Sequence, residues 1–217
     1  MSENQISQPA GLARLLGNRR LLIYGGLALV AVIITIIVLT SNSASTFQVT
    51  NSASGHAMTL LVDPQHAGTV YAGNDQGKVF LSNDGGQTWT SRSAGLPGNA
   101  NAPISALLEQ SNDAHLYAGT DGGVYGSIDG GQHWTKTGGS GATGSGLPGE
   151  DVVDALAFGS ADGKTILAGT ARGGVYISHD GGTSWQASGN GLPDHADIYG
   201  LTATPKFDAI FAALIGA

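Results

Sequence analysis

The 217-residue chain has no cysteine, and only 12% of its residues are charged. The lack of cysteine excludes disulfide bonds, thiolate metal sites and a cysteine nucleophile. So few charges argue against a helix bundle or a coiled coil, which are rich in Glu and Lys. Glycine, by contrast, occurs 35 times, about twice its usual share of ~7%. This composition favours an all-β fold of short strands joined by tight turns.

The charges are distributed unevenly along the chain. Residues 41–217 carry fifteen Asp or Glu and six Lys or Arg, which gives this part a net charge of −9. Because such a surface repels a phosphate backbone, we expect no nucleic-acid partner. Cationic ligands, sugars and proteins are the classes of partner left open.

Residues 21–40 form a run without a charge, LLIYGGLALVAVIITIIVLT. As a helix this run would be roughly 30 Å long, enough to cross a bilayer. Three arginines precede it, Arg14, Arg19 and Arg20. The next positive charge is Lys78, so the positive-inside rule predicts a single-pass protein of the cell membrane. Residues 1–20 would be a cytoplasmic tail and residues 41–217 would lie outside. A cleaved signal peptide and a buried core helix are the alternatives.

Three eight-residue segments resemble one another in the rest of the chain. They read SNDGGQTW from Ser82, SIDGGQHW from Ser127 and SHDGGTSW from Ser178, so they start 45 and 51 residues apart. Gly-Leu-Pro follows each of them. A repeat of about 40–50 residues suits the four-stranded blade of a β-propeller. We therefore predict a propeller domain of antiparallel blades over residues 56–217. Its inner strands would be Met58–Val62, Ile104–Leu108, Val152–Phe158 and Ile198–Ala203.

Each segment is predicted to form the hairpin between the third and fourth strands of its blade, with the fourth strand beginning at the tryptophan. The Gly-Gly pair allows the positive φ of a tight turn. The Asp and Ser side chains can accept hydrogen bonds from turn N–H groups, and the Trp ring can cover the turn. The residues expected in these structural roles are Ser82, Asp84, Gly86, Trp89, Ser127, Asp129, Gly131, Trp134, Ser178, Asp180, Gly182 and Trp185.

The three segments fit S/T-x-D-x-G-x-T/S-W and so resemble the Asp-box of bacterial-neuraminidase (BNR) repeats. Similar boxes occur in sialidases, sortilin-like receptors, xyloglucan-cleaving glycosidases and photosystem assembly-factor propellers. The resemblance covers residues 56–217 and implies a β-propeller. It implies no single activity, because these families share the fold and differ in function. His133 stands where the pattern has Thr or Ser, and we expect it to loosen that turn.

The fourth repeat is incomplete. Ile198–Ala213 matches the first two strands of the first repeat, and no fourth box follows. Residues 41–55 are interpreted as a linker in which Thr46–Thr50 forms an outer strand. We thus expect three full blades and a partial one. Three explanations are open: a fragment or degenerate copy of a longer propeller, two copies that pair to give a seven-bladed ring, or a four-bladed ring closed by Thr46–Thr50.

Propellers usually bind ligands on the face that carries the loops between the second and third strands and between blades. The candidate residues on this face are Asp75, Asp121, Asp151, Asp154, Arg172, Asp194, His195 and Asp197. The alternative is a set of solvated turn residues, since Asp commonly bonds to its own turn backbone. Asp151 and Asp154 would be the first pair to test as general acid and base. A spacing of three in a strand directs them to opposite faces, which weakens that case.

We predict a binding or assembly module for a protein or glycan partner, with no catalytic residues. Only Arg92 and Arg172 follow residue 40, too few for the arginine triad that a resemblance to sialidases implies. The histidines lack metal-ligand spacing, so we expect no metal and no cofactor. A glycoside hydrolase, or a degenerate relative of one, is the alternative. A second alternative is an assembly factor for a membrane complex.

Overall fold

The computed structural model describes residues 34–38, 46–50, 55–110, 114–138, 147, 152–189, 191–193 and 195–215. All of them belong to one compact unit, Val32–Ala217. Among the described residues the secondary structure consists of strands and turns. The predicted all-β fold is thus confirmed for this part of the chain.

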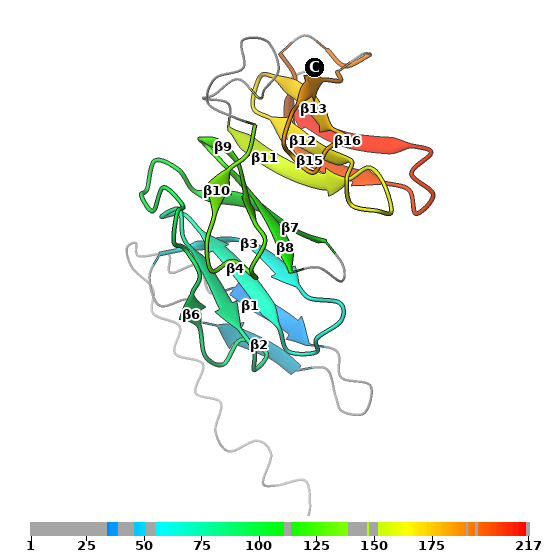
Figure 1. Ribbon diagram of the computed structural model, residues 1–217. Helices are drawn as coiled ribbons and strands as arrows, with labels where there is room; N and C mark the ends of the chain where they lie inside the picture. The colour runs from blue at the N-terminus through cyan, green and yellow to red at the C-terminus, as the bar shows by residue number, and fades with distance from the viewer. Residues whose placement is uncertain are drawn as a thin grey trace, which may run out of the picture. The chain divides into compact units, whose positions relative to one another are not determined.

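Three four-stranded antiparallel sheets follow one another, and we call each a blade (Figure 1). The first has β3 (Ala57–Val62), β4 (Val70–Asn74), β5 (Val79–Ser82) and β6 (Thr90–Ser91). The second has β7 (Ile104–Gln110), β8 (His115–Thr120), β9 (Gly123–Ser127) and β10 (Thr135–Lys136). The third has β11 (Val153–Phe158), β12 (Ile166–Thr170), β13 (Gly174–Ser178) and β14 (Gln186–Ala187). A two-stranded sheet follows, with β15 (Asp197–Ala203) and β16 (Ile210–Ile215), and we call it the half-blade.

The predicted strands agree with this arrangement. Neighbouring strands in the sequence pair within each blade, as the predicted four-stranded unit requires. The fourth strand starts one residue after each box tryptophan, at Thr90, Thr135 and Gln186, rather than at the tryptophan itself. The tryptophan ring packs between blades instead: Trp134 belongs to the first interface cluster and Trp185 to the second.

The segment before the first blade differs from the prediction. β1 (Ile34–Val38) pairs with β2 (Thr46–Thr50), so the expected strand at 46–50 is present. β1 lies within the run predicted as a membrane helix, and the rest of that run, 21–33 and 39–40, lies outside the described residues. Over 34–38 the helix prediction is not met. The sequence ITIIV is β-branched throughout, which favours extended backbone. A search of the described part of the chain finds no helix suited to crossing a bilayer.

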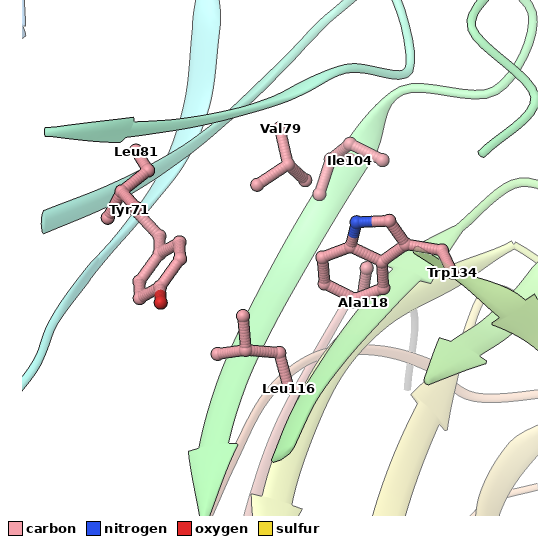
Figure 2. Close-up of a cluster of buried hydrophobic side chains, with 7 residues drawn as sticks. All are labelled: Tyr71, Val79, Leu81, Ile104, Leu116, Ala118 and Trp134. Carbon is pink, nitrogen blue, oxygen red and sulfur yellow. The ribbon is translucent and has the colours of Figure 1, made fainter. Parts of the chain in front are cut away.

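The core lies between consecutive blades. Figure 2 shows the first interface, where Tyr71 and Leu81 of the first blade meet Ile104 and Trp134 of the second. The second and third interfaces repeat this arrangement around Val153 and around Ile198. The leucine of each Gly-Leu-Pro packs against one of these clusters; the three are Leu96, Leu147 and Leu192. Each repeat therefore buries its apolar side chains only with the help of its neighbour.

Glycine in the second strand of each blade allows the close approach of the next blade. A Cβ at Gly73 would lie 2.5 Å from Ile104 Cγ2, and one at Gly169 would lie 2.5 Å from Ile198 Cγ2. At Gly119 it would lie 2.7 Å from the carbonyl oxygen of Val153. These distances are far below van der Waals contact, so a side chain here would force the blades apart.

Candidate functional site

The Asp-box turns are held by their own side chains. In the first box, Gly86 N donates to Ser82 Oγ at 2.8 Å, and the Ser82 hydroxyl donates to Asp84 Oδ1 at 2.8 Å. Asp84 also accepts bonds from Thr88 N at 2.9 Å and from Thr88 Oγ1 at 2.6 Å. The serine and the aspartate thus satisfy turn N–H groups that would otherwise have no partner.

The second and third boxes repeat these bonds. Asp129 accepts a bond from His133 N at 2.9 Å, and His133 Nδ1 lies 2.7 Å from Asp129 Oδ2. The imidazole therefore occupies the place of the usual hydroxyl. The expected loosening of this turn does not follow, because the bond to the aspartate is retained. Asp180 is held in the same way by Ser184 N at 2.8 Å.

These bonds lower the pKa of the box carboxyls. The hydroxyl and N–H of Thr88 lower the pKa of Asp84 to about 2. The N–H of His133, then its ring, lower the pKa of Asp129 to about 2. Burial alone would raise the pKa of Asp180, but hydrogen bonds from Ser184 and Ser178 hold it below its usual value. A carboxyl with such a pKa stays ionised near neutral pH and is a poor general acid.

The opposite end of the blades carries the predicted ligand face. There, Asp75 bonds within its own blade, since its carboxylate accepts from His56 N at 2.9 Å and lies 2.8 Å from His56 Nδ1. Burial would raise the pKa of Asp75, but these bonds to His56 keep it below its usual value. Asp75 is thus a turn residue, as the solvated-turn alternative expects.

Three other predicted residues are brought together from different sheets. Asp121 follows β8, Asp154 lies in β11, and Asp197 begins β15. Burial raises the pKa of Asp154, and the nearby charges of Asp121 and Asp197 raise it further. A hydrogen bond from Ser105 acts in the opposite direction and lowers this pKa. Burial also raises the pKa of Asp121. We call the surface formed by Asp121, Asp154 and Asp197 the acidic loop face.

Among the described residues, no lysine or arginine forms a salt bridge with this face. Within the described ranges, the salt bridges join histidine to aspartate in other turns, at His56, His66 and His133. Asp197 Oδ1 is buried and has no hydrogen-bond partner among the described residues. Desolvated, unpaired carboxylates favour the approach of a cationic group.

The remaining predicted residues are Asp151, Asp194, Arg172 and His195. Asp151 and Asp194 lie outside the described residues. Arg172 and His195 are exposed in loops, with φ of 72° and 58° in the left-handed region that non-glycine residues seldom adopt. No group of His, Asp or Glu in the described part of the chain is placed to hold a metal ion.

Sequence reasoning missed two features. Ser105 occupies the same bulge position in β7 as Asp154 in β11, and an alignment of the repeats would have shown this. A cleft of about 690 Å³ also lies at the box end of the second and third blades, lined by Tyr117, Gly126 and Lys164 among others. Gly126 stands where the first blade has Leu81 and the third has Ile177.

Comparison with known families agrees with this architecture. The family model described as photosynthesis system II assembly factor YCF48 matches residues 43–192, more than half of the chain. The chain belongs to this family. No curated protein sequence matches it at a significant level.

Solved structures similar to this YCF48-family chain share its fold. A GH74 enzyme of Niastella koreensis is 21% identical, with 73% of this chain covered and a TM-score of 0.53. The Pan2 WD40 domain of Neurospora crassa is 16% identical, with 74% covered and a TM-score of 0.55. A chain of the COPII outer coat vertex on membranes is 14% identical, with 75% covered and a TM-score of 0.53. This chain spans between 26% and 44% of the length of these chains.

Proposed function

We propose that the chain is a membrane-tethered, extracytoplasmic propeller that binds a basic segment of a protein partner and so assists assembly. The acidic loop face is the observation that carries this proposal. Asp121, Asp154 and Asp197 come from three successive sheets, and the charges of two of them raise the pKa of the third. An arginine or lysine side chain from a partner would relieve this repulsion. Membership of a family of assembly factors favours a protein over a small substrate.

The proposal is tested by removing the charge and keeping the shape. We expect the combined variant Asp121→Asn, Asp154→Asn, Asp197→Asn to lose at least about tenfold in partner recovery from native membranes. The matched control, Asp63→Asn, Asp162→Asn, Asp208→Asn, removes as many charges from the loops at the opposite end of the blades. Equal loss in both variants would point to long-range charge alone, and no loss in either would contradict the proposal.

The membrane tether is proposed on the sequence alone. The charge-free run 21–40 and the arginines before it support a single span with residues 41–217 outside the cell. In such a span residues 34–38 would be helical in the bilayer, in place of the strand β1 that pairs with β2. Alkaline extraction of membranes and added protease test both parts. The tether predicts that the chain stays in the alkali-resistant pellet, and the orientation predicts that external protease digests residues 41–217. Release into the supernatant would contradict the tether.

A glycan-cleaving enzyme is the second candidate, and one observation favours it. A carboxyl with a raised pKa, such as that of Asp154, is the kind of group that serves as a general acid. Reporter glycosides and a glycan array would test this candidate with the wild-type chain, Asp154→Ala and Asp151→Ala. Turnover that disappears in these variants would favour the enzyme, whereas binding without turnover would favour a glycan-binding module.

A further inference from the structure

The cleft of about 690 Å³ at the box end of the second and third blades has no part in the function proposed above. Its lining from the second blade includes Tyr117 of β8, Gly126 of β9 and Thr137, which follows β10. The third blade contributes its turn at 162–164 and its box residues 179–181. Clefts of roughly 300–1,000 Å³ are the size that small organic ligands occupy.

The repeats provide an internal comparison of side-chain size at this cleft, because equivalent residues share one strand register. Gly126 has the register position of Leu81 in the first blade and of Ile177 in the third. Thr137 N makes the bond to the third strand that Arg92 N makes in the first blade. Two lining positions of the cleft therefore hold smaller residues than their equivalents in the first blade.

A lysine at the cleft is also particular to the third blade. The carbonyl oxygen of Lys164 accepts a bond from the first glycine of the adjacent box, as those of Gly68 and Ala114 do in the other two full blades. The backbone role is thus the same in all three, and only the third blade adds a cationic side chain. Lys164 is exposed, and it joins no salt bridge among the described residues.

Two histidines of the cleft depart from the repeat in the same way. His115 stands directly before the paired residues of its second strand, where the other full blades have Thr69 and Thr165. His179 is the second residue of its box, and the other two boxes have Asn and Ile there. Both histidines line the cleft. Three side chains that can donate hydrogen bonds or carry positive charge are therefore gathered from three separate segments.

The carboxylates of the cleft are engaged by their own turns. Asp180 accepts bonds from Ser184 N at 2.8 Å and from Ser184 Oγ at 2.6 Å. Asp162 accepts bonds from Ser160 Oγ and from Lys164 N. Because these oxygens already have donors, the polar groups left for a ligand are mainly donors, and they suit a ligand that supplies acceptor oxygens.

Apolar surface lies beside these donors. Ile128 lines the cleft and is 78% exposed. The Tyr117 hydroxyl donates to Gly181 O at 3.2 Å, so the tyrosine offers the cleft its ring. A Cβ at Gly126 would lie 3.7 Å from Tyr117 Cε1, so an atom in that place would be in van der Waals contact with the ring.

We propose that this cleft binds a small organic carboxylate with an apolar body. Lys164, His115 and His179 supply the donors for the carboxylate. Tyr117 and Ile128 contact the apolar body. The fold does not require these donors, because the first and second blades form the same kind of interface without them. The site lies at the opposite end of the blades from the acidic loop face and is independent of the partner proposed there.

Calorimetric titration of the full-length chain in a non-ionic detergent tests the need for a carboxylate. The probe is 2-naphthoate, and its neutral analogue is 2-naphthamide. We expect naphthoate to bind with a dissociation constant of about 1 mM or lower and naphthamide to bind at least about tenfold more weakly. No binding of naphthoate would contradict the site, and equal affinity for the two probes would contradict the role of the carboxylate.

A pair of lysine variants tests whether the cleft itself is used. Lys164→Gln should weaken naphthoate binding at least about fivefold and leave naphthamide within about twofold. The matched control, Lys206→Gln, removes the same charge from an exposed position in the corresponding turn of the half-blade, between β15 and β16. It should leave both probes within about twofold of the wild type. An equal loss in the two variants, or no loss in Lys164→Gln, would overturn the proposal.

A third variant fills the cleft with the residue of the first blade. In Gly126→Leu the Cβ would lie 3.1 Å from Thr137 Cγ2, so a shift of a few tenths of an ångström accommodates it. We expect naphthoate to bind at least about tenfold more weakly, with a melting temperature within about 3 °C of the wild type. Unchanged affinity in a folded variant would contradict the proposed place of binding, and the lysine comparison does not depend on how this variant folds.

Discussion

Trp89 and Trp134 end boxes of nearly the same sequence, yet they lie in different surroundings. Trp134 is 3% exposed, packs with Tyr71 of the preceding blade, and donates from Nε1 to Arg92 O at 2.8 Å. Trp89 is half-buried and donates from Nε1 to Gly86 O of its own turn at 3.1 Å. The comparison shows that the box residues fix the turn locally, whereas the neighbouring blade supplies the core.

The largest expected effect comes from removing these two rings. Trp134→Ala opens a cavity inside an interface and should lower the free energy of unfolding by about 3–5 kcal/mol. Trp89→Ala should cost about 1–2 kcal/mol, because less of its surface is buried. Urea denaturation of both variants measures the difference. Equal losses would show that the tryptophan acts through its turn and not through the adjacent blade.

Glycine replacement gives a smaller contrast. Gly73→Ala brings a Cβ to 2.5 Å from Ile104 Cγ2, and we expect a loss of about 1–3 kcal/mol. Gly200→Ala in the half-blade has its nearest contact at 3.4 Å, with Ala213 Cβ, and should cost less than about 1 kcal/mol. Thermal unfolding of the two variants checks this, and a larger cost at Gly200 would reverse the proposed order.

The loss of folding stability in acid that comes from the box aspartate should be similar for the first and second blades. The pKa of Asp84 and of Asp129 is lowered from 3.8 to about 2 in the folded chain. The stability that each ionised carboxyl contributes is therefore present above about pH 4 and is lost as the pH falls toward 2. Asp84→Asn and Asp129→Asn should each flatten this acid-induced loss to a similar degree. Unfolding followed by fluorescence over a range of pH measures this loss of stability. An effect seen only in Asp129→Asn would contradict the view that each box stabilises its own turn.

The smallest effect is expected at the acidic loop face. The pKa of Asp154 is raised by burial and by its acidic neighbours, so ionisation destabilises the fold as the pH rises through that value. Asp154→Asn should then raise the melting temperature by about 1–3 °C near neutral pH. At about pH 3 the wild-type carboxyl is itself protonated, and the wild type and the variant should have the same melting temperature. A lower melting temperature of the variant near neutral pH would show that the carboxylate is stabilising.

Local patterns predicted the blades well because each box carries its own turn chemistry. The serine and the aspartate of a box bond to groups of the same box, so spacing alone identified the hairpins. Residues 34–38 were predicted wrongly, since apolarity and length fit a membrane helix while β-branching fits a strand. The sequence predicted Asp121, Asp154 and Asp197 only as members of a longer set of candidate ligand-binding residues. That these three lie together could not be predicted, because it depends on how successive sheets stack.

Photo-crosslinking of the full-length chain in its native membrane tests the central claim, that the acidic loop face contacts a protein partner. A photoreactive residue at Gly122 lies beside Asp121, where an added Cβ has no neighbour closer than 3.5 Å. The same residue at Ile128, which is 78% exposed at the box end, is the control. The account predicts protein adducts from position 122 that disappear with Asp154→Asn and Asp197→Asn, and none above background from position 128. Adducts from position 128 alone, or from neither position, would contradict it.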